Sequence, residues 1–158
     1  YYHLSELGHS IVIAGGGLTA CETALNLASL GHEVTMVVRK ARITPSTFGY
    51  YRNALLDEMD KRGIKQMLST VPIEFTADGL VCEKATDDKG TPGGERLVVR
   101  ADTYMYSFGM EPNSELAGAL AAAAEEVGAK VFNIGNSNRA TIVRDAVHDG
   151  YKAAMAVI

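Results

Sequence analysis

The sequence predicts an α/β domain in which a central parallel sheet is combined with an antiparallel β-meander. An apolar run at 11–14, a helical pattern at 18–30 and a second apolar run at 33–38 follow one another, which is the order of a parallel strand–helix–strand unit. Residues 71–102 instead alternate apolar and polar positions between turn dipeptides, as antiparallel strands do. The chain of 158 residues is long enough to bury a sizeable core.

Strands and helices alternate in the first part of the chain. Strands are expected at 10–14, 33–38 and 64–68, and helices at 18–30 and 48–62. The first helix has one apolar stripe, and Gly31 is a suitable residue to end it. Ser46 or Thr47 can cap the second helix, which we expect to stop at Gly63.

The second part of the chain changes character. The meander carries turn signals at Asp78-Gly79, Lys89-Gly90 and Gly93-Gly94. After it we expect a strand at 103–108, a helix at 114–127, a strand at 131–134 and a helix at 140–157. We divide the chain into 1–109 and 110–158, and expect the two segments to pack as one domain. The chain begins almost at once with a strand and ends in an apolar helical stretch, so we expect a piece of a longer polypeptide.

Composition and charge argue against several classes of function. The net charge of −4 is unlike that of a general nucleic-acid binder, and no apolar run approaches the length of a membrane span. Cys21 and Cys82 lack the spacing of a zinc site or a redox pair, so we expect no metal. The histidines and Ser107 lack the setting of a catalytic triad, so we name no catalytic residue. Two isolated cysteines and no signal-peptide pattern fit a cytoplasmic protein.

A glycine-rich turn joins the first strand to the first helix. It reads G-x-G-x-x-A over Gly15, Gly16, Gly17, Leu18, Thr19 and Ala20. In this pattern the first glycine permits a tight turn, the second lets a pyrophosphate approach the backbone, and the third small residue lets helix and strand pack closely. The helix N-terminus then offers N–H groups to the phosphates. The pattern predicts a Rossmann-like, three-layer dinucleotide-binding domain, and a glycine turn that only packs strand against helix is the alternative.

The residues after the second strand indicate which dinucleotide binds. In NAD-binding units an acid about 20 residues further on accepts hydrogen bonds from the ribose, whereas an arginine there accommodates a 2′-phosphate. Here the position is close to Val38, and Arg39, Lys40 and Arg42 surround it with positive charge. A guanidinium can hold a phosphate with two parallel hydrogen bonds. We therefore expect NADPH, with NADH as the other candidate and a solvated basic loop as the alternative.

Glu22 lies on the first turn of the first helix. It can be an acid that interacts favourably with the helix dipole, which is common in a first turn. It can also be a polar contact near the reactive end of the cofactor. The spacing alone favours the helix-dipole interpretation.

Four segments resemble one known family. "GGGLTACETA" is similar to the G-G-G-x-x-G/A-x-E-x-A signature of a pyridine nucleotide domain, and "VVRKAR" to the NADPH-type ending of its second strand. "ADTYMYSFGMEPNSEL" resembles a later A-D-to-P-N segment, and "VFNIGNSNRATIVRDAVHDGYKAA" a returning FAD segment. Their order resembles the pyridine nucleotide-disulfide oxidoreductase superfamily of two-dinucleotide-binding-domain flavoproteins. The nearest likeness is to the C-terminal region of 2,4-dienoyl-CoA reductases and NADH:flavin oxidoreductases, the Old Yellow Enzyme-like group.

This resemblance implies roles for individual residues. Gly15, Gly17 and Ala20 would line the pyrophosphate turn, and Arg39 would meet the 2′-phosphate with Lys40 or Arg42. Glu22 would help to position the nicotinamide end of the cofactor. With this resemblance the helix-dipole and cofactor-contact interpretations of Glu22 are equally favoured. Gly109 would let the chain pass close to the cofactor. Gly135 and Asn136 would occupy the I-G-D positions that contact the flavin nucleotide.

The chain departs from the family in three places. Asn136 replaces the family's aspartate, the first FAD-binding glycine motif is absent, and so is the redox C-x-x-x-x-C. FAD is therefore expected in the full-length protein rather than on these residues alone. The partners implied are the missing FAD-binding or FMN-binding portions of the parent polypeptide. A thiol–disulfide mechanism has no support.

The function expected is that of an NAD(P)H-binding domain in a flavin-dependent oxidoreductase, positioning the nicotinamide for hydride transfer to a flavin. The cofactors carry the chemistry in such an enzyme, and the domain supplies binding and orientation. We expect the isolated fragment to be inactive. One alternative is a nucleotide-sensing or structural ADP-binding module without redox turnover. A second is a methyltransferase, against which Val38 argues because a ribose would require an acid there.

Overall fold

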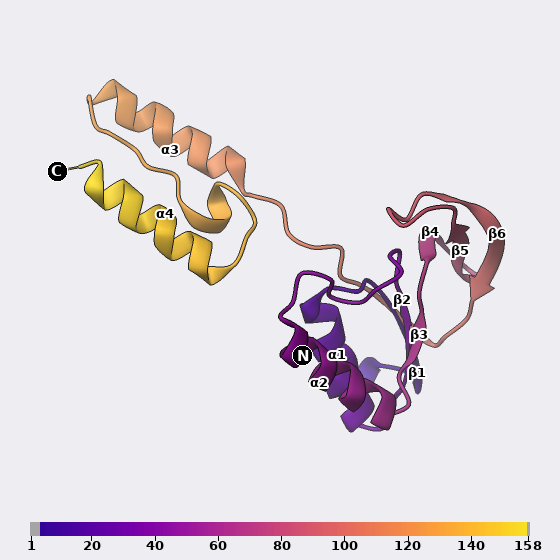
Figure 1. The fold of residues 1–158 in the computed structure, drawn as a ribbon. Helices are drawn as coiled ribbons and strands as arrows, with labels where there is room; N and C mark the ends of the chain where they lie inside the picture. The colour runs from indigo at the N-terminus through magenta and orange to yellow at the C-terminus, as the bar shows by residue number, and fades with distance from the viewer. Residues whose placement is uncertain (1–3, 158) are drawn as a thin grey trace. The chain divides into compact units, whose positions relative to one another are not determined.

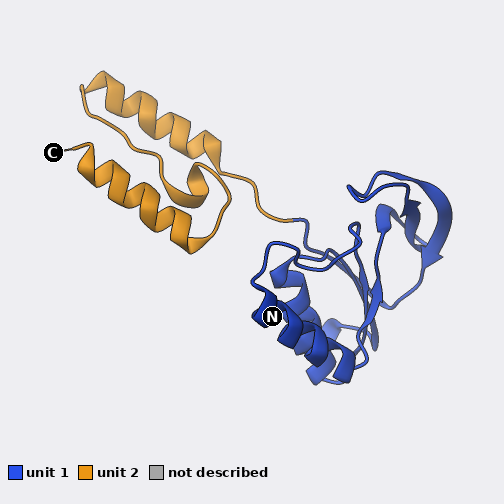
Figure 2. Ribbon diagram, in the orientation of Figure 1, with its two compact units in different colours: residues 1–108 blue, residues 109–158 orange. Residues whose placement is uncertain are grey.

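The structure is a computed structural model that describes residues 4–157, and Figure 1 shows the order of its elements. They are η1 (Leu4–Glu6), β1 (Ser10–Ala14), α1 (Leu18–Ser29), β2 (Glu33–Val37), α2 (Gly49–Lys61), β3 (Lys65–Met67), β4 (Thr70–Thr76), β5 (Gly79–Ala85), β6 (Pro92–Val99), β7 (Thr103–Tyr106), α3 (Ser114–Glu126), η2 (Gly135–Ser137) and α4 (Val143–Met155). The chain divides into two compact units, Tyr1–Phe108 and Gly109–Ile158, which Figure 2 colours separately.

A parallel sheet of four strands forms the centre of unit 1. Its order is β3-β2-β1-β7, and every neighbouring pair is parallel. Strand β1 lies between two partners, so that Val12 is opposite Thr35 on one side and Tyr104 on the other. The central parallel sheet expected from the strand–helix–strand pattern is confirmed.

Two apolar layers lie on opposite faces of this sheet, because successive side chains of a strand point to opposite sides. Ile11 and Ile13 belong to the core that α1 and α2 cover. Val12 and Ala14 pack instead with Leu80 of the antiparallel sheet β4-β5-β6. Figure 1 shows the helices on one side of the parallel sheet and the meander on the other. The three-layer α/β fold is therefore confirmed, with the meander in place of one crossover helix.

Each of the two apolar layers contains one cysteine. Cys21 of α1 lies in the core beneath the helices, and Cys82 of β5 lies in the core beneath the meander. Both are free thiols, and burial raises the pKa of each to about 11. At neutral pH they are protonated and therefore weak nucleophiles.

Neither a metal site nor a helix that could span a membrane is found among residues 4–157. Between residues 4 and 157 no group of three His, Cys, Asp or Glu side chains is arranged to hold a metal ion. Over the same part of the chain no helix has the length and apolar character needed to cross a bilayer.

The start of α2 differs from the expectation. Phe48 occupies the N-cap position, and no side chain caps this helix. The prediction of a cap at Ser46 or Thr47 is wrong, because Thr47 lies in a preceding turn where its N–H donates to the carbonyl of Thr44 at 3.0 Å. Thr44 has φ +42, so the chain makes a left-handed turn before the helix begins.

Unit 2 contains α3, η2 and α4, and among its described residues only Gly135 is buried. The strand expected at 131–134 is wrong, because this segment forms no strand. A β-strand requires a neighbour to share its hydrogen bonds, and the described part of unit 2 has no other strand. The apolar side chains of α3 and α4 are largely exposed; they include Leu116, Leu120, Val143, Val147, Tyr151 and Met155.

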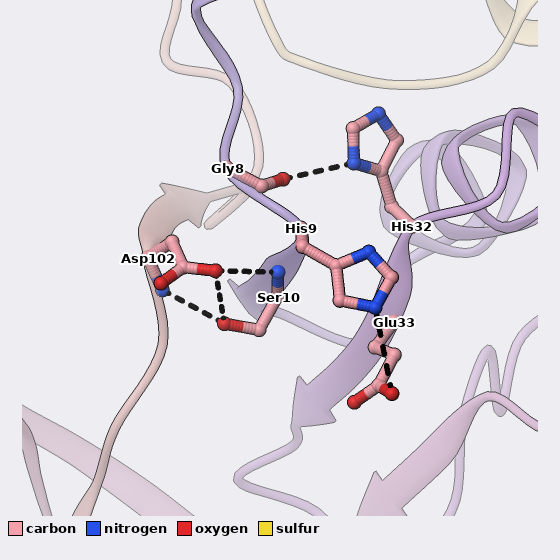
Figure 3. A network of polar contacts seen from close by, with 6 residues as sticks. All are labelled: Gly8, His9, Ser10, His32, Glu33 and Asp102. Atoms are coloured by element: carbon pink, nitrogen blue, oxygen red, sulfur yellow. Dashed lines mark hydrogen bonds and ion pairs between the residues drawn. The ribbon is translucent and has the colours of Figure 1, made fainter.

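A polar network joins β1 to β7 at the amino edge of the parallel sheet (Figure 3). Asp102 Oδ2 accepts hydrogen bonds from the N–H and the Oγ–H of Ser10, at 2.8 and 2.7 Å. The N–H of Asp102 donates to Ser10 Oγ at 2.9 Å. These bonds to Ser10 hold the pKa of the Asp102 carboxyl below its usual range. Figure 3 also draws the pairs His32–Gly8 and His9–Glu33.

The lowered pKa of Asp102 predicts how stability depends on pH. An ionised Asp102 stabilises the fold above its unfolded pKa of about 4, and this contribution is lost as the pH falls through the lower folded pKa. Asp102→Asn should therefore unfold at less urea than the parent at neutral pH, and the difference should close in acid. Urea unfolding followed by circular dichroism at several pH values measures this. Asp78→Asn, the same charge change in another turn, should not reproduce it, and a difference independent of pH would contradict it.

Candidate nucleotide-binding site

The first glycine of the turn is enclosed between two strand ends. The N–H of Gly15 donates to the carbonyl of Val37 at 2.9 Å, where β2 ends. Gly15 has φ +145, and a Cβ there would lie 2.4 Å from the carbonyl oxygen of Ser107, just after β7. Only glycine fits at position 15, where the turn contacts the carboxyl ends of both β2 and β7. Ligands of open α/β sheets bind at that edge.

The second residue of the turn joins it to the loop after β2. A Cβ at Gly16 would lie 2.4 Å from Val38 Cγ1. The carbonyl of Gly16 accepts a hydrogen bond from the N–H of Thr44 at 2.8 Å. The glycine turn and the basic loop are therefore held against each other.

Gly17 differs from its two neighbours. Its backbone, with φ −78 and ψ 172, is one that any residue adopts, and a Cβ there would meet no atom within 4 Å. Gly17 is the N-cap residue of α1, and its carbonyl accepts a hydrogen bond from the N–H of Cys21 at 3.1 Å. The N–H groups of Leu18, Thr19 and Ala20 precede that bond, so they form the open end of the helix. Nothing in the fold itself requires glycine at Gly17.

An open cavity of about 360 Å³ lies beside this helix end. It is lined by Ile13, Thr19, Ala20, Thr23, Tyr104, Met105, Tyr106 and Ser107. Ala20 is fully buried, as the close packing of helix on strand requires. Tyr106 and Ser107 were not foreseen as site residues. The available signal was their position at the end of a strand parallel to β1.

The basic loop presents three cations beside the glycine turn. Val38 is buried, whereas Arg39, Lys40 and Arg42 are exposed. The N–H of Val38 donates to the carbonyl of Met67 at 2.9 Å, which keeps the start of the loop on the sheet. Between residues 4 and 157 none of the three cations forms an ion pair. All three charges therefore remain available to an anionic ligand.

Glu22 has a partner that the sequence did not indicate. Tyr51 of α2 donates its hydroxyl hydrogen to Glu22 Oε1 at 3.1 Å, and this bond raises the pKa of Tyr51. Glu22 is exposed, so it remains accessible. Both interpretations of Glu22 stay open, and its contact with a cofactor stays a prediction.

The remaining predicted residues lie in unit 2. Gly109 is exposed, has φ +104 and would meet no atom with a Cβ. Gly135 has φ +64 and is buried against Ala146, 3.3 Å from the position of an added Cβ. Asn136 Oδ1 accepts a hydrogen bond from the N–H of Thr141 at 3.2 Å, just before α4. The roles of these three residues toward a cofactor stay predictions.

A tight glycine turn between a buried strand and an open helix end, at the carboxyl edge of a parallel sheet, defines unit 1 as a Rossmann-type dinucleotide-binding domain. The chain belongs to the pyridine nucleotide-disulphide oxidoreductase family, whose model matches residues 1–143. The resemblance stated from the sequence is thereby confirmed, with an NAD(P)-binding domain. Homologues in this family are oxidoreductases that use NAD(P)H and FAD.

Individual relatives show the extent of the match. The chain is 29% identical over 145 residues to bilirubin reductase of Mediterraneibacter gnavus (strain CC55_001C), covering 91% of this chain and 21% of that protein. It is 32% identical over 111 residues to dihydrolipoyl dehydrogenase 1, mitochondrial, of Arabidopsis thaliana, covering 69% and 21%. The structure of a 2-naphthoyl-CoA reductase matches with a TM-score of 0.76 and 27% identity, over 92% of this chain and 21% of that one. The chain thus spans about a fifth of each of these proteins.

Proposed function

We propose that unit 1 binds NADPH and orients its nicotinamide toward a flavin held by the full-length protein. When bound, the pyridine nucleotide supplies a hydride and the flavin accepts it. The residues of this chain bind and orient, and none is required as an acid or base. Membership of an NAD(P)-dependent flavoprotein oxidoreductase family supports this proposal over a purely structural or sensing module and over a methyltransferase.

The main observation in support of the proposal is the open space around Gly17. The fold requires glycine at positions 15 and 16, where a Cβ would overlap Ser107 and Val38. At position 17 a Cβ would overlap no atom. A bare backbone there leaves open space directly over the N-terminus of α1. A pyrophosphate placed in that space would receive hydrogen bonds from the first N–H groups of the helix. A ligand that approaches this backbone would explain the glycine at the N-terminus of α1.

The basic loop supports the choice of NADPH. An adenosine ribose at the end of β2 would find no carboxylate on buried Val38. A 2′-phosphate would instead find the unpaired guanidinium of Arg39, with Lys40 and Arg42 close by in the chain. Arginine suits this task because its planar group can donate two parallel hydrogen bonds to a phosphate.

Unit 2 supports the proposed partner, which is the FAD-binding or FMN-binding portion of the parent polypeptide. Its two longer helices expose apolar side chains and form no core among the described residues. Such a pair of helices gains stability only by burying that surface against another layer. We propose that the flavin-binding portion supplies the layer and that FAD binds there.

Gly17→Ala is the variant that tests nucleotide binding. We expect it to lose at most about 1 kcal/mol of stability, because the added methyl meets no protein atom and alanine is only a less favourable N-cap residue than glycine. Its affinity for both NADPH and NADH should fall about tenfold or more, because the phosphate loses close hydrogen bonds to backbone N–H groups. Calorimetric titration of the chain with each nucleotide measures this. Gly118→Ala, which also adds a methyl in open space, is the matched control.

Two results would contradict the proposal. One is a parent chain that binds neither nucleotide. The other is a Gly17→Ala variant that binds both as well as the parent does. In the full-length protein, bleaching of the flavin absorbance on addition of NADPH checks the hydride transfer itself.

A further inference from the structure

The turn between β5 and β6 is built rigidly. Asp87 accepts hydrogen bonds from the N–H of Thr91 at 2.9 Å and from its hydroxyl at 2.7 Å. The N–H of Gly90 donates to the carbonyl of Asp87 at 3.1 Å, and the N–H of Thr86 to that of Thr91 at 2.8 Å. The bonds from Thr91 hold the pKa of Asp87 below its usual range. These hydrogen bonds within the turn fix the position of the Gly90 backbone.

This turn lies against the loop that follows β2 (Figure 1). Gly90 is buried although it belongs to a surface turn. A Cβ on Gly90 would lie 2.1 Å from Arg39 Cγ, 2.8 Å from its Cδ and 2.9 Å from its carbonyl oxygen. The aliphatic part of Arg39 thus rests directly on the backbone of Gly90. A methyl group at Gly90 would take the space in which the Arg39 side chain lies.

Other bonds hold the backbone on either side of Arg39. The N–H of Ser69 donates to the carbonyl of Lys40 at 3.1 Å. The N–H of Val38 donates to the carbonyl of Met67, as described above. With its backbone fixed and its aliphatic stem supported, Arg39 loses less conformational freedom when its guanidinium grips a ligand.

We propose that Gly90 is a specificity-determining position, which directs the Arg39 guanidinium toward the 2′-phosphate of NADPH. This inference rests on the proposed function of unit 1. Gly90 acts through Arg39 and is a positioning residue. The β5–β6 turn, which is distant in sequence from the glycine motif, thereby becomes part of the cofactor site.

Gly90→Ala tests the inference when it is titrated with two probes, 2′,5′-ADP and ADP. We expect affinity for 2′,5′-ADP to fall about fivefold, since an arginine must then be immobilised from a free state, while affinity for ADP stays unchanged. Gly93→Ala is the matched control: Gly93 is in the same hairpin, has φ +137, and its added Cβ would only touch Thr86 at 3.4 Å. It should share the backbone strain and keep the probe preference.

Three further measurements separate positioning from folding. In an Arg39→Gln background, Gly90→Ala should have no additional effect on 2′,5′-ADP affinity, because its effect passes through Arg39. Thr91→Val, which removes the hydroxyl bond to Asp87 without adding an atom against Arg39, should give a smaller selective loss. The NMR signal of the Arg39 Nε–H group should shift in Gly90→Ala and stay in place in Gly93→Ala, with no ligand present.

The outcomes distinguish the inference from the proposed function. If Arg39→Gln lowers the affinity for 2′,5′-ADP and Gly90→Ala does not, the inference is overturned and the function stands. If Arg39→Gln leaves that affinity unchanged, the proposed preference for NADPH fails, and the inference fails with it. If Gly90→Ala lowers the affinity for both probes equally, the glycine serves only the fold, and the inference is wrong.

Discussion

Gly15→Ala is expected to destabilise unit 1 by about 3 kcal/mol or more. The added Cβ would lie 2.4 Å from the carbonyl oxygen of Ser107, and it would do so at φ +145, where side chains are rarely accommodated. The contact cannot relax by a rotamer change, because the Ser107 oxygen belongs to the backbone, and the N–H of Ser107 donates to the carbonyl of Ala14 of β1 at 2.8 Å. Urea unfolding followed by circular dichroism measures the loss of stability.

Gly31→Ala separates the two causes of that loss. Gly31 also has a positive φ, +93, but a Cβ there would meet no atom within 4 Å. Its variant should lose only the cost of a left-handed backbone, about 1–2 kcal/mol. Equal losses at Gly15 and Gly31 would show that the contact with Ser107 carries no energy, and would contradict the geometry of the turn.

Arg39→Glu is expected to weaken NADPH binding about 100-fold, which corresponds to about 2.7 kcal/mol. The change removes charge-assisted hydrogen bonds to the 2′-phosphate and places a like charge beside it. NADH lacks that phosphate, so its affinity should change little. Calorimetric titration with both nucleotides measures the difference.

Lys65→Glu is the control for a general effect of charge. Lys65 is exposed at the start of β3, where it lies opposite Thr35 of β2, four residues before Arg39. The same change of two charge units there should leave the preference for NADPH intact. A similar loss in both variants, or an equal loss of NADPH and NADH in Arg39→Glu, would make the basic loop a solvated surface.

The sequence predicted the centre of the fold because local and distant requirements coincide there. Strand β1 is apolar on both faces, so Ile11–Ala14 could be recognised as a buried parallel strand before its neighbours were known. The glycine turn was visible for the same reason, since the motif joins adjacent elements. The two wrong predictions, the cap at Ser46 or Thr47 and the strand at 131–134, concern residues whose structure depends on contacts outside their own segment. The N–H of Thr47 bonds to Thr44 in a turn before the helix, and the segment at 131–134 has no neighbouring strand among the described residues of unit 2.

The candidate site was predictable only where its residues are close in the sequence. The glycine turn and the basic loop follow one another in one strand–helix–strand unit, and both were found. Ser107 follows β7 and Gly90 lies in the β5–β6 turn, and no local pattern connects them with Gly15 or Arg39. Their contribution is steric and arises only after the sheet has assembled.

The reactivity of the two buried cysteines can report on local opening of unit 1. Cys21 and Cys82 lie beneath different layers of the fold, and each is inert while its layer stays closed. A thiol-specific reagent can therefore modify Cys21 only when the helices lift from the sheet, and Cys82 only when the meander does. Mass spectrometry of the two labelled peptides over time would give separate opening rates for the two sides of one domain, with no engineered probe.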